Sequence, residues 1–296
     1  MGRSNGNNIS ADRGAWISMI SYLSLSTIKL IMGYLFNSTA LVADGLNNTT
    51  DIIASVAVLI GLKMSRKPPD ANHPYGHSRA ETIASLVTSL IMATIGIQVL
   101  IDAVRVIFSK EQVVPDIAAA WIALIGALIM LLVFFYNRSL SIKTNSRALM
   151  AVAKDNFSDA MVSLGAFVGI IGAQYNFPWL DPLAAIIVGI IILKTSWDIF
   201  SEATHMLTDG FEPNELEPLK ETILTVTGVK DIKDIKARSY GNEIVVDAVI
   251  EVNPDLNVLE SHNITDQIEE KMRSIHKIKD VHIHIEPKMN TGKEDE

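Results

Sequence analysis

Six long apolar runs occupy the first two thirds of the chain. They cover approximately residues 14–36, 39–62, 82–108, 117–137, 148–173 and 179–200. The hydrocarbon core of a bilayer, about 30 Å thick, is crossed by roughly 20 residues of helix, so each run is long enough to span it. The pattern predicts an α-helical membrane protein with six transmembrane helices.

The remainder of the chain, from about residue 209, alternates charged and apolar positions. Helical spacing is expected from Pro213 to about Val226 and again over 257–276, with Val258, Ile264, Ile268 and Met272 on its apolar face. Two strands are expected on either side of Gly241–Asn242, and a third over 280–287. The order α-β-β-α-β predicts a small α+β domain over 209–296, following a membrane domain over 1–208.

The composition agrees with a membrane protein and excludes some classes of partner and metal site. The mean hydropathy is +0.28 and 49% of the 296 residues are hydrophobic. The net charge of −8 and the absence of a basic patch exclude nucleic acid as a partner. The chain has no cysteine, which excludes disulfides and thiolate metal sites.

The orientation follows from the basic residues in the loops. They collect at the N-terminus and in the 63–80 and 138–147 loops, whereas the opposite loops near 37, 109 and 176 offer essentially Lys110. By the positive-inside rule, both termini and the polar tail are expected in the cytoplasm of a multi-pass protein of the cell membrane.

Two pairs of polar residues interrupt the apolar runs near mid-depth. Asn47 and Asp51 are one helical turn apart in the second run, and Asp155 and Asp159 have the same spacing in the fifth. If these antiparallel helices pack together, Asn47 meets Asp159 and Asp51 meets Asp155. Three converging carboxylates repel one another unless a cation or protons neutralise them, so the pattern predicts a divalent metal site that can exchange metal for protons.

Other polar residues nearby have a simpler interpretation as hydrogen bonds between helices. This interpretation suits Asn48, Thr49, Thr50, Ser158 and Ser163, but it accounts poorly for three aspartates at mid-depth. Asp44 lies one turn nearer the outer surface, where a solvated entrance or an interfacial salt bridge is expected rather than a metal ligand.

With six spans, a polar quartet split between spans two and five, and a polar tail, the chain resembles the cation diffusion facilitators over residues 14–287. The quartet is similar to that of the manganese-exporting bacterial branch, because the zinc branch usually has histidine there or, in some bacteria, four aspartates. The resemblance implies a homodimeric exporter of Mn²⁺ working by proton antiport, with a metallochaperone-like tail that dimerises. An all-oxygen site also favours a harder ion than Zn²⁺. Export of Zn²⁺, Fe²⁺ or Cd²⁺ stays open as the alternative.

The cytosolic loop between spans two and three contains Asp70, His73 and His77 at D-x2-H-x3-H spacing. Two imidazoles and a carboxylate can wrap a cation, although surface histidines near prolines are common without one. The resemblance implies a second metal site here, with a structural or regulatory role. It also implies a salt bridge between Arg79 and Asp209 at the junction of membrane and cytosol.

In the tail, His262, His284 and Glu286 fall where family members bind cytosolic metal. Two further positions that often hold histidine are Lys233 and Val249 in this chain. The resemblance therefore leaves two alternatives: a reduced site for divalent cations, or a solvated histidine face that lines the dimer.

Two other classes of protein fit less well. An intramembrane aspartyl protease needs Tyr-Asp and Gly-x-Gly-Asp patterns, which do not surround Asp51, Asp155 or Asp159, so we expect no enzyme. A membrane metal sensor that transports nothing would keep the tail but would not need carboxylates at mid-depth.

Overall fold

The computed structural model describes residues 3–109, 114–144, 147–240, 243–278 and 280–289, without the side chains of residues 3–15, 144, 147 and 148. Lys110 and the turn expected at Gly241–Asn242 lie outside the described residues. The chain forms two compact units, residues 1–59 with 87–200 and residues 60–86 with 201–296. The second unit therefore contains the 66–78 loop and the ends of the helices on either side of it.

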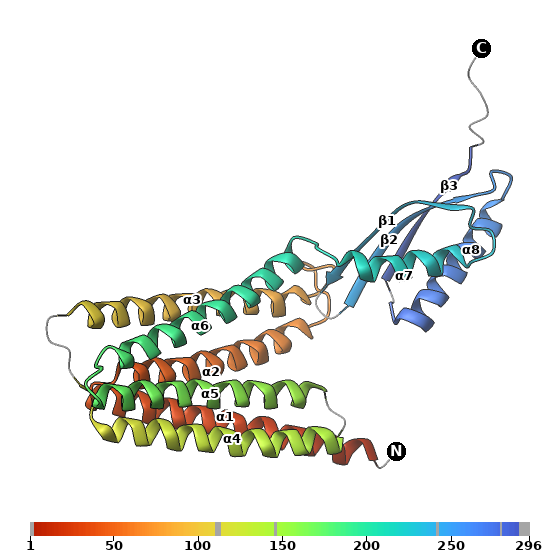
Figure 1. Ribbon diagram of the computed structural model, residues 1–296. Coiled ribbons are helices and arrows are strands. Elements are labelled where there is room, and N and C mark those ends of the chain that lie inside the picture. Colours follow the sequence, from red (N-terminus) through yellow and green to blue (C-terminus); the bar gives the residue numbers. More distant parts are fainter. Residues whose placement is uncertain (1–2, 110–113, 145–146, 241–242, 279, 290–296) are drawn as a thin grey trace. The chain divides into compact units, whose positions relative to one another are not determined.

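Six long helices confirm the predicted membrane architecture (Figure 1). Their bounds are α1 Arg3–Leu35, α2 Thr39–Ser65, α3 Arg79–Phe108, α4 Ile117–Thr144, α5 Arg147–Gln174 and α6 Leu180–Leu207. Each contains a stretch that is long and apolar enough to cross a bilayer. Within the first unit, α4 packs along both α1 and α5.

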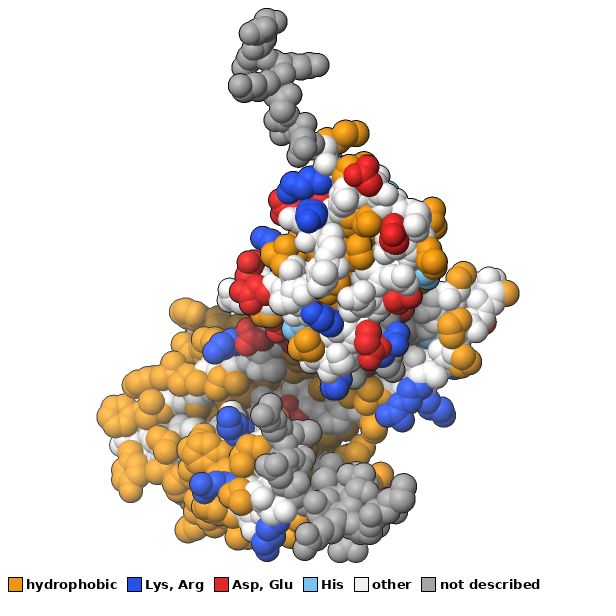
Figure 2. Space-filling view, turned by 90° about the vertical axis from the view of Figure 1, so that its right-hand side faces the viewer, with side chains coloured by type: hydrophobic (Ala, Val, Ile, Leu, Met, Phe, Trp, Pro, Cys, Tyr) orange, Lys and Arg blue, Asp and Glu red, His pale blue; other side chains and the backbone are white. Residues whose placement is uncertain are grey.

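Apolar side chains cover the outside of these helices (Figure 2). Large residues such as Trp121, Leu132 and Trp197 are exposed, as expected for a surface that faces lipid. Between the helices, small side chains such as Ala119, Ala123 and Ala166 are fully buried. Small residues let helix backbones approach closely in a membrane, where packing replaces the hydrophobic effect as the driving force.

The tail forms the expected order of helices and strands. Helix α7 spans Pro213–Leu224, β1 Asp231–Tyr240, β2 Glu243–Val252, α8 Val258–Lys271 and β3 Asp280–Pro287. A short π-helical turn, η1 (Met272–His276), continues α8 and was not predicted. Strand β2 is central, antiparallel to β1 and parallel to β3.

One face of this sheet packs against α7 and α8. The core includes Ile223 of α7, Val246 and Ile250 of β2, and Ile268 of α8. Val258 was expected on the apolar face of α8, but it is 86% exposed. The reason is its position as the first residue of the helix: Asn257 forms a capping box with Glu260, so Val258 precedes the turns that reach the sheet.

The connection from α7 to β1 depends on Gly228. Its φ is +105°, a conformation that residues with a side chain rarely adopt, and a Cβ there would lie 2.6 Å from Ile264 Cδ1. The glycine therefore serves both the turn and the close approach of α8.

We predict that Gly228→Ala destabilises the α+β tail by roughly 1–3 kcal/mol, because alanine is strained at this φ and collides with Ile264. Amide hydrogen exchange of the full-length protein over 231–252 should become faster. Gly165→Ala is the matched control, since a Cβ at Gly165 of α5 meets nothing within 4 Å. Unchanged exchange in Gly228→Ala would show that the turn tolerates a side chain.

Candidate metal centre

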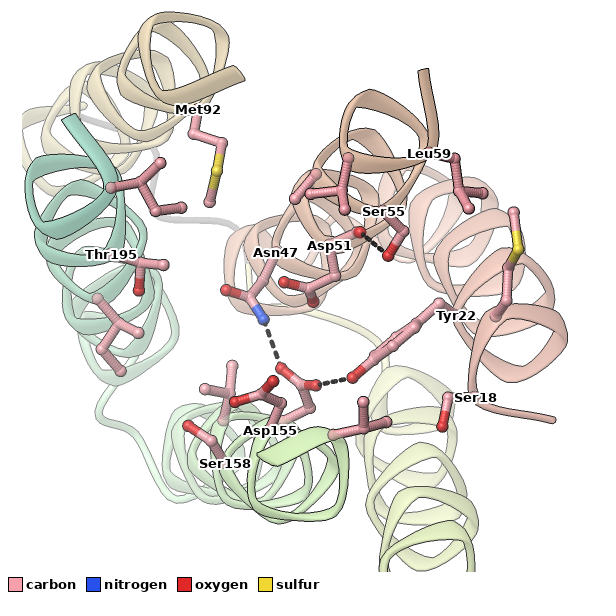
Figure 3. A pocket seen from close by; sticks show the side chains of 18 of the residues that line it. Ser18, Tyr22, Asn47, Asp51, Ser55, Leu59, Met92, Asp155, Ser158 and Thr195 are labelled. Carbon is pink, nitrogen blue, oxygen red and sulfur yellow. Dashed lines mark hydrogen bonds between the residues drawn. The ribbon is translucent and has the colours of Figure 1, made fainter. Parts of the chain in front are cut away.

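The polar quartet comes from α2 and α5, which present it to a common cavity of about 640 Å³ (Figure 3). Asn47 and Asp51 enter from α2, and Asp155 and Asp159 enter from α5. The expected pairing of Asn47 with Asp159 is present, since Asn47 Nδ2 donates a hydrogen bond of 2.9 Å to Asp159 Oδ1. Asp51 and Asp155 both line the cavity.

The three carboxylates of the quartet lie together without an ion-pair partner among the described residues. Asn47 and Asp159 are buried, Asp51 is partly buried, and Asp155 is exposed to the cavity. Asp51 Oδ2 is buried and has no hydrogen-bond partner among the described residues. None of the three aspartates forms a salt bridge with a described lysine, arginine or histidine. Bare carboxylates gathered beside a cavity can hold a cation, and they can hold protons in its absence.

The cavity extends from the quartet in one direction only. It follows α2 through Ser55 to Leu59, and it reaches Val152 of α5 and Trp16 of α1. These residues lie toward the end of α2 that leads into the 66–78 loop. The quartet therefore stands at the inner end of a space that opens toward this side of the helices.

Helix α1 also contributes to the site, which the sequence analysis did not predict. The Tyr22 hydroxyl lies 2.8 Å from Asp159 Oδ2 and 2.9 Å from Asn156 Oδ1, and it can donate its single hydrogen to one of them at a time. Asn156 Nδ2 in turn donates to Ser18 Oγ. Tyr22 thus fixes the second oxygen of Asp159 while Asn47 fixes the first.

A second buried polar cluster surrounds Lys29 of α1. Its ammonium donates to Asp44 Oδ1 at 2.9 Å, Asn48 Oδ1 at 2.7 Å and Ser163 Oγ at 2.9 Å. The expectation for Asp44 needs correction, because this residue is fully buried and paired with Lys29 rather than placed at an entrance or an interface. Asn48 and Ser163 do form the expected hydrogen bonds between helices.

A signal for α1 was present in the sequence. Ser18, Tyr22, Ser26 and Lys29 follow one another at intervals of four, four and three residues, which places them on one face of a helix. Ser26 also uses this face, since its hydroxyl bonds the Gly45 carbonyl and Thr49 of α2. The polar stripe was hidden because the first run is apolar on average.

In the second unit, the loop residues Asp70, His73 and His77 come together. Their ligand atoms all lie within 4.8 Å of one another, and this is the sole such group of three among the described histidines and acidic residues. Asp70 Oδ1 lies 3.0 Å from His73 Nδ1, and Asp70 Oδ2 lies 3.5 Å from His77 Nε2. Hydrogen bonds from the ring and backbone of His73 hold the pKa of Asp70 below its ordinary value, so this carboxylate stays ionised.

Next to this trio, Arg79 lies 2.5 Å from Asp209. Asp209 reaches it from a left-handed turn, φ 59°, just after α6, a conformation that aspartate tolerates better than most residues. The Arg79 guanidinium also lies 5.4 Å from the centre of the Tyr240 ring, and the Tyr240 hydroxyl donates to the carbonyl of Gly76. Tyr240 was not predicted, and it connects β1 to the loop between the two histidines.

The three tail residues do not gather within one chain. Lys233 Nζ lies 2.6 Å from Glu286 Oε2, and this contact raises the pKa of Lys233. His284 is 3.9 Å from the other Glu286 oxygen, whereas His262 pairs with Asp266 at 3.6 Å. A metal ion at Glu286 would therefore compete with the Lys233 ammonium.

Comparison with known proteins identifies the family of this chain. The model of the cation efflux transmembrane domain matches residues 15–208, and that of the cation efflux protein cytoplasmic domain matches residues 211–288. The manganese efflux system protein MneS of Bacillus subtilis (strain 168) is 55% identical over 93% of this chain and 95% of its own length.

Two further relatives from the same organism cover the chain to a similar extent. The uncharacterized transporter YdbO is 49% identical over 93% of this chain and 95% of its own length. The manganese efflux system protein MneP is 32% identical over 92% of this chain and 95% of its own length. With both family models matched and full-length relatives well above 30% identity, this multi-pass membrane protein belongs to the cation diffusion facilitator family of cation efflux transporters.

Proposed function

We propose that this protein exports Mn²⁺ from the cytoplasm in exchange for protons, as a homodimer in the cell membrane with both termini on the cytoplasmic side. The observation that carries the proposal is the quartet itself: three aspartates and one amide, all oxygen donors, line one cavity without a described basic partner. Relatives described as manganese efflux proteins support the choice of ion.

The cavity explains how an ion would enter. It lies on the side of the quartet that faces the 66–78 loop, which the positive-inside rule assigns to the cytoplasm. Mn²⁺ entering this way meets Asp51 and Asp155 first and displaces the hydrogen bond between Asn47 and Asp159. Metal binding and protonation both neutralise these carboxylates, so a bound metal ion excludes protons and bound protons exclude the metal ion. This competition is the physical basis of antiport.

Alternating access would then rock helices around the fixed quartet until it faces the opposite side. We also propose a division into a membrane domain over 1–208 and a cytosolic domain over 209–296 that joins two protomers. The Arg79–Asp209 pair, with one residue in each of these domains, would act as the hinge between them.

Replacing Asp51 or Asp159 by alanine should lower Mn²⁺ flux into proteoliposomes by ~100-fold or more, since even partners of metal ligands cost about 10–100-fold. Proton movement in the opposite direction, followed with a pH-sensitive dye, should disappear together with it. Asp102→Ala removes a carboxylate that is hydrogen-bonded to Gln98 elsewhere in the membrane helices and serves as the control. Retained flux in Asp51→Ala would refute the site, and wild-type Mn²⁺ flux without proton flux would refute antiport.

Asn47→His should shift the ratio of Zn²⁺ to Mn²⁺ flux upward by roughly tenfold, because imidazole suits the softer ion better than an amide oxygen does. The control is Ser158→His, which places an imidazole in the same cavity outside the quartet. If the two variants change the ratio equally, or neither changes it, Asn47 does not decide the choice of metal.

The loop trio is expected to bind a cation without carrying transport. In an Asp51→Ala background, the double variant His73→Ala/His77→Ala should bind about one Mn²⁺ fewer per protomer in equilibrium dialysis. In the otherwise wild-type protein, the same pair should leave the flux above half of normal. His282→Ala, an exposed histidine of β3, is the control. Equal metal binding by all variants would contradict a loop site.

A further inference from the structure

The cluster around Lys29 is a fully buried charged group in the membrane helices, and it shares no residue with the quartet. Lys29 and Asp44 are both fully buried. An ammonium has three donors, and the three acceptors Asp44, Asn48 and Ser163 use all of them. Helix α4 leaves room for this side chain at Gly126, where a Cβ would lie 2.9 Å from Lys29 Cε. Four helices therefore meet at one ammonium.

The cluster lies next to the quartet, on the side away from the cavity. Along α5, Ser163 follows Asp159 by one turn, and along α2, Asp44 precedes Asn47 by nearly one turn. Lys29, Asp44, Asn48 and Ser163 are absent from the lining of the cavity, which ends at Asn47, Asp159 and Val162. The cluster thus occupies the position that an ion would meet next on leaving the quartet for the opposite side.

The cluster also has the composition of a cation site. A carboxylate, an amide oxygen and a hydroxyl surround the ammonium, and these are the donor types that hard cations bind. Asp44 Oδ2 and Asn48 Nδ2 have no hydrogen-bond partner among the described residues. A buried ion pair with unsatisfied atoms contributes little net stability compared with apolar packing. Stability alone therefore does not explain its presence.

We propose that Lys29 is a positioning residue of the transport cycle, whose ammonium fills this oxygen cluster and holds α1, α2 and α5 together on the side opposite the cavity. While the cluster is intact, this side stays closed, and an ion at the quartet has access to the cavity alone. The cluster must part before the ion can leave on the far side. The direction in which the metal ion moves rests on the proposed function, whereas the closure of the helices on the side opposite the cavity does not.

The chain has no cysteine, so a single introduced thiol can report the closure. Ala166 is suited to this purpose, because it is fully buried on α5, two turns beyond Asp159 on the same face, and alanine and cysteine are close in size. In Ala166→Cys protein reconstituted into vesicles, a membrane-impermeant maleimide should react slowly from the side opposite the cavity. In the same protein carrying Lys29→Met and Asp44→Asn, which remove both charges together, labelling should become roughly tenfold faster or more.

Transport provides an independent readout. With Mn²⁺ supplied on the cavity side, the entry route along the cavity is unchanged in the double variant, while its maximal rate should change by roughly tenfold. The control is Lys194→Met, which removes an exposed lysine from α6. Ser163→Ala is a second variant in case the double variant does not fold. It removes one of the three acceptors and leaves the ion pair in place, so it should speed labelling to a smaller extent.

The proposal is overturned if the folded double variant, or Ser163→Ala, has the same labelling rate and maximal transport rate as Lys194→Met. Lys29 would then be a static anchor between helices. Wild-type protein that moves no Mn²⁺ would instead overturn the proposed function. The labelling rates would still decide the role of Lys29, so the two failures are distinguishable.

Discussion

The constraint on which this structure depends is the cost of placing carboxylates at membrane depth. Each buried charge requires a compensating partner, and an uncompensated one costs several kcal/mol or more. Asp44 forms an ion pair with Lys29, but none of the three aspartates of the quartet forms an ion pair with a described basic residue. The Lys29 charge acts on Asp51 and Asp159 without contacting them, so the remaining compensation for the quartet has to come from a metal ion or from protons. A site whose neutralising charge is exchangeable has the basic property that an antiporter needs.

Helix α1 organises this arrangement although it contributes no predicted ligand. Its polar face bonds α5 through Tyr22, α2 through Ser26, and both together through Lys29. Tyr22 and Asn47 hold the two oxygens of Asp159 from different helices, which fixes this ligand before an ion arrives. A movement that separates α1 from α5 would release Asp159 at the same time as it opens the Lys29 cluster. The position of the ligands and the closure of the helices are thus coupled through one helix.

The sequence predicted the six helices and the order of elements in the tail from hydrophobic periodicity. It predicted the pairing of Asn47 with Asp159 from the matching spacing of the two polar pairs, on the condition that the second and fifth helices pack together. It did not predict the roles of Tyr22, Lys29 or Tyr240. Tyr22 and Lys29 lie in a polar stripe that the sequence does show, but the stripe does not tell which helices carry their partners, and nothing near Tyr240 in the sequence points to Gly76. The burial of Asp44 was missed for a related reason: counting residues along α2 gives its depth, but only the neighbouring α1 determines whether it meets water or an ammonium.

The clusters of oxygen-bearing side chains in this protein differ in whether a lysine of the same chain supplies a cation to them. Lys29 fills the cluster of Asp44, Asn48 and Ser163, and Lys233 neutralises Glu286 in the tail. A tethered ammonium binds at very high effective concentration, so a free ion must displace it and gains correspondingly less. The quartet has no tethered cation, and its affinity for metal carries no such penalty. The distribution of lysines thus distinguishes the proposed metal site from the clusters that already hold a cation of the chain, although oxygen atoms are the donors in all of them.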